Sequence, residues 1–434
     1  MAVAAGHEGR THARWFPILA LVFVATLINY LSRAVFGLAK PMFLSELHID
    51  QAMGGLIAAG FGITYALVQI PVGALLDRFG TRLTYFVSLV TWSCFTLAQG
   101  FAGSGVVIFA NQIGNGLCES PCFPANSRVL AHWFPQKERA RANSIYAVGQ
   151  TIGTGLLIVP LLWVVAHYGW RSMFVITGIA GIMWGFVWFA FYREPQDSSF
   201  ANDAERKYII AGGGLTSNGA AKVKFRLKYI KELLGYRQVL CASIAQFCGN
   251  TVLAFFIFDL PNYLKNQRHL DFVAAPIMVA LPYIGASLGG LVAAQIADAI
   301  LRKGGSVNLA RKLPVVAGLL LAACIVLVDL VPNGQNGLIV AIMCVAFFGQ
   351  GATNLGWTVI SDLAPRQLVG LTGGLFNMIT NFATILTPIL IGWLVQKTGG
   401  FAVPLLYVGA LPLLGVFLYV FVMGDVKRLE VRTD

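Results

Sequence analysis

The segment GALLDRFGTR, residues 73–82, connects two apolar runs of the chain, residues 53–76 and 83–101. A helix of about 20 mostly apolar residues crosses a bilayer core about 30 Å thick, so each run is long enough to span a membrane. The glycines of the segment permit close helix packing, and Asp77 can bond backbone amides or a basic partner at a helix end. The segment therefore predicts a tight loop between two membrane-spanning helices.

A weaker copy of this segment follows another apolar run in the second part of the chain. It reads GGLVAAQIADAILRKGG, residues 289–305, and again places glycine early, then Asp298, then Arg302 and Lys303, then glycine. When a unit of several helices is duplicated, the same sequence motif recurs in the equivalent loops of the two copies. The copy therefore predicts two related halves.

The composition of the chain agrees with a membrane protein. Of its 434 residues, 57% are hydrophobic and 12% are charged, against a charged share of roughly 25% in soluble domains. We predict an all-α membrane protein with twelve transmembrane helices in two pseudo-symmetric six-helix bundles, over residues 1–192 and 237–434, joined by a cytoplasmic linker, 193–236. The predicted spans are residues 15–35, 53–76, 83–101, 105–130, 142–167, 172–192, 239–264, 274–300, 313–331, 337–357, 368–395 and 401–423.

The positive charge of the chain, +12, falls in short loops between the apolar runs and not on one face. This placement argues against a nucleic-acid-binding protein, and short loops rich in Lys and Arg stay in the cytoplasm. With both termini cytoplasmic, 25 of the 31 Lys and Arg residues lie on the cytoplasmic side. Arg33 lies within the first span, and the outer loops hold Lys40, Arg171, Lys265, Arg268 and Lys397.

The linker is the one long polar stretch of the sequence, and its second part is basic. We expect this part to form an amphipathic helix on the anionic cytoplasmic leaflet, which needs no nucleic acid to explain its charge. Its basic residues are Lys222, Lys224, Arg226, Lys228 and Lys231.

Several motifs of the chain are similar to those of one transporter family. They are residues 73–82 and their copy, the first-helix segment that begins at Arg33, ESPCFPANSRVLAHWFPQKERARA at 119–142, SDLAPRQLVGLTGGLFN at 361–377 and GDVKR at 424–428. On these residues the chain resembles the major facilitator superfamily over essentially its whole length. More narrowly, it resembles the anion:cation symporter family and its bacterial sugar-acid transporters for hexuronates, galactonate and glucarate.

The resemblance implies a multi-pass protein of the bacterial cytoplasmic (inner) membrane. Its two bundles rock about a central site, and proton entry by symport drives the import of an organic anion such as a hexuronate or aldonate. The implied partners are this small sugar-acid anion, protons and the lipid bilayer. We expect a monomer with no nucleic acid, no metal and no cofactor beyond the proton.

Arg33 lies roughly eighteen residues into the first predicted span, and Glu119 lies near the middle of the fourth. An unpaired cation at such a depth costs roughly 3 kcal/mol, so Arg33 must face a cavity or a partner. We expect its planar guanidinium to bind the substrate carboxylate; a structural pair with an acidic neighbour is the alternative. We expect Glu119 to take up and release the coupled proton, as the resemblance implies; the alternative is a fixed counter-ion to Arg33.

The chain departs from the resembling family at two positions. Many relatives have Asp immediately before the first-helix Arg and Arg seven residues before the fourth-helix Glu, whereas this chain has Ser32 and Gln112. Both members of a potential ion pair are therefore neutral, and a Ser and a Gln can satisfy each other. The loss of one acid predicts one proton site and leaves the stoichiometry, and symport itself, open.

Sugar hydroxyls require neutral donors and acceptors on a largely apolar wall. Six residues within the spans supply such groups, although each could instead bond between helices. The predicted substrate-binding residues are Tyr30, Tyr65, Gln150, Trp357, Asn377 and Asn381. The predicted gate and motif residues are Asp77, Arg78, Arg82, Arg139 and Asp298, while Asp259 and Asp362 are expected at interfaces with water.

Other classes of function fit the sequence less well. An enzyme is not predicted, because the spans show no HExxH, no GxSxG at a predicted turn and no Walker motif. Charges buried singly fit alternating access better than a continuous pore. An exchanger or uniporter for another small carboxylate remains the alternative, since Ser32 replaces an acid.

Overall fold

The computed structural model describes residues 11–214, 227–270, 276–332, 334–365 and 368–430. Within these ranges the chain forms helices and no β-strand. The first part contains η1 (Arg14–Ile18), α1 (Leu19–Glu46), α2 (Gln51–Leu67), α3 (Gln69–Gln99), α4 (Gly105–Glu119), α5 (Cys122–Trp133), α6 (Gln136–Thr151), η2 (Ile152–Leu156), α7 (Ile158–Tyr168) and α8 (Trp170–Phe191). The linker contains α9 (Asp203–Ala211) and α10 (Leu227–Gly235). The last part contains α11 (Arg237–Phe258), α12 (Leu260–Asn266), α13 (Pro276–Arg302), α14 (Val307–Ala323), η3 (Cys324–Leu330), α15 (Asn336–Thr353), α16 (Gly356–Leu363), α17 (Val369–Thr398), α18 (Ala402–Phe417) and η4 (Leu418–Val422).

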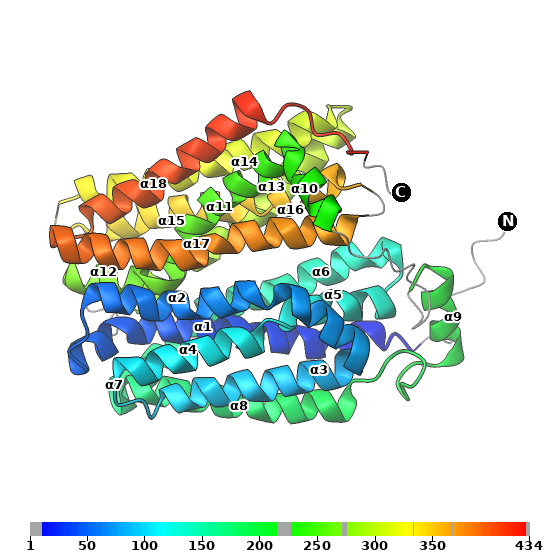
Figure 1. Cartoon of the computed structure of the whole chain (residues 1–434), viewed down its shortest axis with the longest axis horizontal. Helices are drawn as coiled ribbons and strands as arrows, with labels where there is room; N and C mark the ends of the chain where they lie inside the picture. Colours follow the sequence, from blue (N-terminus) through cyan, green and yellow to red (C-terminus); the bar gives the residue numbers. More distant parts are fainter. Residues whose placement is uncertain (1–10, 215–226, 271–275, 333, 366–367, 431–434) are drawn as a thin grey trace.

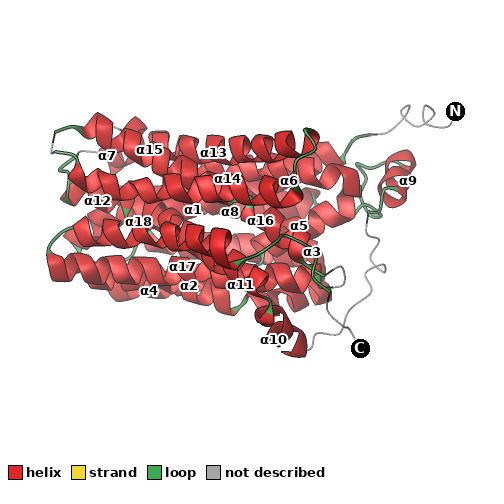
Figure 2. Cartoon of the chain, turned by 90° about the horizontal axis from the view of Figure 1, so that it is seen from above, coloured by secondary structure: helices red, strands yellow, loops and turns green. Residues whose placement is uncertain are grey.

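The helices lie in two groups along the long axis of the molecule. Figure 1 shows α1–α8 on one side, which we call the N-terminal half, and α11–α18 on the other, which we call the C-terminal half. Both chain ends and the linker helices α9 and α10 lie at one end of the bundle, the terminal end, in Figures 1 and 2. The opposite end, where α12 lies, is the distal end.

The helices account for the predicted membrane spans. Among the described residues, nine helical segments are long and apolar enough to cross a membrane, and they match the first and the fifth to twelfth predicted spans. The second prediction, residues 53–76, covers α2 and the first turns of α3, the third covers the later part of α3, and the fourth covers α4 and α5. The loop predicted between the second and third spans lies within α3, where the backbone leaves helical geometry at Gly80, with φ 75° and ψ 166°. The predicted all-α membrane fold is therefore confirmed, whereas the total of twelve spans stays a prediction.

The fourth predicted span, residues 105–130, is interrupted near its middle. Helix α4 ends at Glu119 and α5 begins at Cys122, with Ser120 and Pro121 between them. Proline has no backbone N–H to donate to the preceding turn, so it stops a helix at this point. The break leaves Glu119 as the last residue of α4.

Two predictions at the distal end were wrong. Helix α1 does not end near residue 35 but continues to Glu46, so Lys40 lies inside it and not in an outer loop. Asp259, expected at an interface with water, is buried between α11 and α12. The Lys40 Nζ lies 2.5 Å from Asp259 Oδ1, and both side chains are 1% exposed. Mutual neutralisation is what allows both charges to be buried.

Apolar packing joins the two halves at the distal end. One buried cluster crosses between them and includes Phe36 and Phe43 of α1 with Phe258 and Tyr263 of the C-terminal half. The Phe36 and Phe258 rings meet edge to face, with centroids 6.2 Å apart. Towards the terminal end, two further clusters form, one within the N-terminal half and linker and one within the C-terminal half. The halves thus share a core distally and have separate cores towards the termini.

Close backbone approach at this shared core depends on Gly37. A Cβ atom at residue 37 would lie 1.8 Å from the carbonyl oxygen of Ile257, in the C-terminal half. We therefore expect Gly37→Ala to force α1 and α11 apart, destabilise the protein by about 1–3 kcal/mol and lower its Tm. Gly337→Ala is the matched control, because no neighbouring atom lies within 4 Å of a Cβ there. Equal Tm values for the two variants would contradict this packing.

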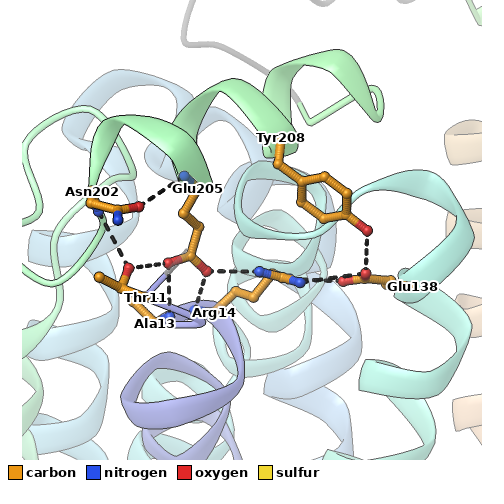
Figure 3. Close-up of polar contacts among 7 residues, drawn as sticks. All are labelled: Thr11, Ala13, Arg14, Glu138, Asn202, Glu205 and Tyr208. Atoms are coloured by element: carbon orange, nitrogen blue, oxygen red, sulfur yellow. Dashed lines mark hydrogen bonds and ion pairs between the residues drawn. The ribbon is translucent and has the colours of Figure 1, made fainter. Parts of the chain in front are cut away.

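A buried charge network docks α9 on the terminal end of the N-terminal half, as Figure 3 shows. The Arg14 Nε lies 2.8 Å from Glu138 Oε2, and its Nη1 lies 2.9 Å from Glu205 Oε1. Glu205 also accepts the backbone N–H groups of Ala13 and Arg14, at 2.9 and 3.2 Å. The Tyr208 hydroxyl donates to Glu138 at 2.6 Å. The N-terminal segment, α6 and α9 are therefore tied together.

The predicted basic helix of the linker is described only in part. Lys222, Lys224 and Arg226 lie outside the described residues, whereas Lys228 and Lys231 lie on α10. The predicted role of this segment at the membrane surface stays a prediction.

The α9 network predicts a pH-dependent loss of stability. Burial acts to raise the pKa of Glu205, but hydrogen bonds from Thr11, Ala13 and Arg14 outweigh it, and the pKa lies below its ordinary value. The carboxylate therefore stabilises the fold above its unfolded pKa of about 4.3, and this contribution is lost as pH falls through the lower folded pKa. We expect Glu205→Gln to lower Tm at neutral pH, and the difference from the wild type to vanish in acid.

The exposed Asp203 on the same helix provides the control. Asp203→Asn should leave the Tm unchanged at neutral pH. A Tm difference between Glu205→Gln and the wild type that is the same at neutral and acid pH would show that the charge of Glu205 has no part in docking α9.

Candidate substrate and proton site

Arg33 and Glu119 form an ion pair in the middle of the N-terminal half. Arg33 lies near the centre of α1, and Glu119 ends α4 at the Pro121 break. One carboxylate oxygen, Oε1, lies 2.6 Å from Arg33 Nε and 2.5 Å from Nη2. The Arg33 side chain is 10% exposed and that of Glu119 is fully buried. The sequence predicted both residues, and the structure brings them into direct contact.

The geometry of this pair leaves a carboxylate oxygen of Glu119 and several N–H donors of Arg33 able to form further hydrogen bonds. Glu119 Oε2 has no hydrogen-bond partner within the described residues. A guanidinium carries five N–H donors in a planar fork, and Glu119 engages one edge of that fork with a single oxygen. The pair is therefore not the closed, two-pronged arrangement that would consume the binding capacity of both groups.

Three aromatic rings surround the Arg33 guanidinium. Its Cζ lies 5.1 Å from the ring centroid of Tyr30, 4.8 Å from that of Phe61 and 5.1 Å from that of Tyr65. Cation–π contacts of this length stabilise a cation with little water around it. The Gln150 side-chain amide donates to the Tyr30 hydroxyl at 3.1 Å. The predicted Tyr30 and Tyr65 thus contact Arg33, and the predicted Gln150 joins them through Tyr30.

Phe61 was not among the predicted site residues. Taken by itself, an aromatic residue in an apolar span does not reveal whether it lines a site, faces lipid or packs in the core. Its position four residues before Tyr65 on α2 places the two rings on one helix face, and their centroids stack 5.5 Å apart. The partnership with Tyr65 is the signal that could have identified it.

Ser32 and Gln112 do not satisfy each other, so that expectation was wrong. The Ser32 hydroxyl donates to the Asn29 carbonyl at 2.8 Å, within its own helix. The Gln112 side-chain oxygen accepts from Gln99 at 3.0 Å, so it is bonded across to α3. Neutral side chains can use any nearby partner, and the ones they use are local.

The predicted residues of the C-terminal half form a separate group. Asn381 donates to the Asn377 side-chain oxygen at 2.7 Å on α17, and the Trp357 ring meets Phe376 edge to face at 4.8 Å. Within the described residues, neither pair contacts Arg33 or Glu119. The structure therefore brings the predicted site residues together as two groups, one in each half.

The predicted gate and motif residues lie at the terminal end of the bundle. The Arg82 guanidinium donates to the Phe189 carbonyl at 2.7 Å, and Arg139 donates to the carbonyls of Phe134, Ala131 and Gly213 at 2.6–3.0 Å. These contacts anchor helix ends and the linker. The Arg78 and Asp298 side chains are exposed, and the side chain of Asp77 lies outside the described part of the chain.

The apolar helices are those of a membrane protein, and comparison with known families gives its class. The model of the Major Facilitator Superfamily matches residues 22–358, so the chain belongs to this superfamily. It is a transporter and not an enzyme.

Individual relatives are similar over nearly the whole chain. The "Probable galactarate/D-glucarate transporter GudP" of Escherichia coli K12 is 38% identical, covering 99% of this chain and 97% of its own. The "D-galactonate transporter" of Escherichia coli O6:H1 is 35% identical over 98% of this chain and 99% of its own. The "Hexuronate transporter" of Bacillus subtilis is 30% identical over 91% of each chain.

A solved structure shows the same fold at low sequence identity. The bacterial homologue of the human lysosomal transporter Spinster, in an inward-facing and occupied conformation, superposes with a TM-score of 0.69 at 17% identity. The match covers 93% of this chain and 95% of the other.

Proposed function

We propose that the chain imports a sugar-acid anion by proton symport through alternating access. The observation that carries this proposal is the buried Arg33–Glu119 pair, surrounded by Tyr30, Phe61 and Tyr65. The substrate class rests on the relatives named as galactarate, D-glucarate and D-galactonate transporters.

The coupling follows from competition for one guanidinium. In the substrate-free pair, the Glu119 carboxylate holds the position that a substrate carboxylate would take on Arg33. When Glu119 accepts a proton its attraction for Arg33 falls, and the uncompensated cation then requires another anion. Proton and sugar acid therefore bind together, and neither the cation nor the carboxylate is left alone in a dry environment.

Neutral groups around the pair suit the rest of the substrate. The hydroxyls of Tyr30 and Tyr65 and the amide of Gln150 can bond sugar hydroxyls, while the rings exclude water from the ion pair. Closure of the C-terminal half would bring Trp357, Asn377 and Asn381 to the opposite face of the sugar acid. The two separate groups then become a single site.

The shared distal core supports a molecule that is closed at the distal end. Because the predicted loops at the terminal end hold most of the Lys and Arg residues, we place the termini in the cytoplasm and the molecule in the bacterial inner membrane, facing inward. The proposed moving units are residues 1–192 and 237–434, joined by the linker 193–236. We retain Asp77, Arg78, Arg82, Arg139 and Asp298 as cytoplasmic gate residues and a monomer as the working unit.

One sequence feature favours a second mechanism on the same site. Because Ser32 stands where many resembling transporters have an acid, an exchanger or uniporter for a small carboxylate would need no proton. In such a protein Glu119 would remain a fixed counter-ion, and substrate binding would leave its charge unchanged.

Uptake by purified protein in liposomes separates the two mechanisms. The substrates are galactarate, D-glucarate, D-galactonate and a hexuronate, each with and without an inward proton gradient. Symport predicts accumulation above the outside concentration, abolished by a protonophore, with simultaneous alkalinisation outside. Uptake that neither moves protons nor responds to the protonophore would overturn symport and leave the exchanger or uniporter.

A further inference from the structure

A second buried ion pair lies about two helical turns along α1 from Arg33 and joins the two halves. Lys40, seven residues beyond Arg33 on α1, contacts Asp259 at the junction of α11 and α12, with Nζ and Oδ1 2.5 Å apart. Each side chain is 1% exposed, and Asp259 Oδ2 has no hydrogen-bond partner within the described residues. Neither residue has a role in the proposed binding of sugar acid and proton.

Further contacts between the halves surround this pair at the distal end. Gln51 accepts from the Asn262 side chain at 2.7 Å, and Lys265 donates to the Pro41 carbonyl at 3.4 Å. The Ala52 N–H donates to the Gln396 side chain at 3.1 Å. We call the Lys40–Asp259 ion pair together with these surrounding contacts the distal clasp. Lys40 and Asp259 are its charged pair, and the shared apolar core covers them.

The stability of the closed state depends on whether the buried pair keeps both charges, one charge or neither. With both charges present, the closed state is neutral and each charge has its partner. With one charge removed, the remaining charge is stranded without water, so the closed state is penalised and opening, which hydrates it, is favoured. With both charges replaced by apolar side chains of similar size, the closed state loses nothing comparable and is often more stable.

The geometry points to Lys40–Asp259 as the gate pair that holds the distal side closed and sets the balance between inward-facing and outward-facing states. This inference rests on the proposed alternating access. The pair must separate and become hydrated each time the distal side opens, and must re-form each time it closes. Its two charges act only as a unit: loss of either opens the gate, and loss of both closes it.

Hydrogen exchange of the purified full chain tests this inference. The readout is the deuterium uptake of residues 254–266, on the C-terminal side of the clasp. We expect Lys40→Met and Asp259→Leu each to speed exchange there at least about tenfold. The double variant Lys40→Met/Asp259→Leu should return to the wild-type rate or fall below it, and the charge exchange Lys40→Asp/Asp259→Lys should restore slow exchange.

The matched control is a second ion pair at the same end. Arg171 Nη1 lies 2.6 Å from Glu46 Oε1, but both residues are in the N-terminal half and partly exposed. Arg171→Met/Glu46→Leu should leave the exchange of residues 254–266 unchanged. Single clasp variants that exchange at the wild-type rate, or a double variant as fast as the singles, would overturn the gate pair.

The two proposals fail in different ways. If the wild type accumulates a sugar acid with protons while the clasp variants exchange normally, only the gate inference fails. If the exchange pattern appears as expected but the wild type moves no sugar acid, the gate pair stands and the proposed substrate fails. Should a single variant not fold, the double and charge-exchange variants still test the paired behaviour.

Discussion

Arg33→Lys should reduce sugar-acid transport by more than about a hundredfold in kcat/KM, corresponding to about 3 kcal/mol. Lysine keeps the positive charge but loses the planar fork, and a compact ammonium is more strongly hydrated than a guanidinium. It can neither contact a carboxylate with two parallel hydrogen bonds nor lie as well among Tyr30, Phe61 and Tyr65, which now surround the Arg33 Cζ at 4.8–5.1 Å. The measurement is initial uptake into liposomes over a range of substrate concentrations.

Arg171→Lys is the control for this substitution, because Arg171 forms a partly exposed pair with Glu46 away from the site. It should transport like the wild type. If Arg33→Lys kept transport within a fewfold of the wild type, the guanidinium would not bind the substrate carboxylate, and its role would be a structural pair with Glu119.

Glu119→Gln should abolish proton-driven accumulation and leave substrate counterflow largely intact. The amide cannot take up a proton, so the gradient has no group on which to act. It is nearly isosteric and neutral, as protonated Glu119 would be, and therefore leaves Arg33 free for the substrate carboxylate. The two readouts are accumulation under a proton gradient and exchange of labelled for unlabelled substrate without one.

Glu46→Gln is the matched control, because Glu46 pairs with Arg171 at the partly exposed distal end of α1. It should retain both activities. Accumulation by Glu119→Gln equal to that of the wild type would remove Glu119 from proton coupling. Loss of counterflow together with accumulation would show that Glu119 is needed for the transport movement itself.

The sequence offered direct contact between Arg33 and Glu119 only as the alternative to substrate binding and proton coupling, because a charge in an apolar span needs a partner or a cavity. The same reasoning did not identify Lys40 and Asp259. The predicted first span ends at residue 35, which leaves Lys40 in an outer loop, where a charge needs no partner. Only the packing of α1 against α11 and α12 shows that the two charges are buried together.

Local sequence signals identify helix ends but not the residues that line the site. The break after Glu119 follows from Pro121, and helix α9 begins with an available capping signal, since the Asn202 side chain accepts the Glu205 N–H at 2.9 Å. The role of Phe61 was not predicted, because an aromatic side chain in a span can face lipid, core or substrate, and only its spacing of four residues from Tyr65 pointed to the site. The two halves pack together at the distal end and have separate cores towards the terminal end, and this difference depends on contacts between residues far apart in sequence.

The most direct test of the central claim counts the protons taken up when substrate binds. In this account, the incoming carboxylate displaces Glu119 from Arg33, and Glu119 then binds a proton. Calorimetric titration of the purified protein with galactarate, in buffers of different ionisation enthalpy, should show that about one proton is taken up per bound substrate. Glu119 is the group that binds this proton. The uptake should disappear in Glu119→Gln while binding remains. Tight binding by the wild type with no proton uptake would contradict the account.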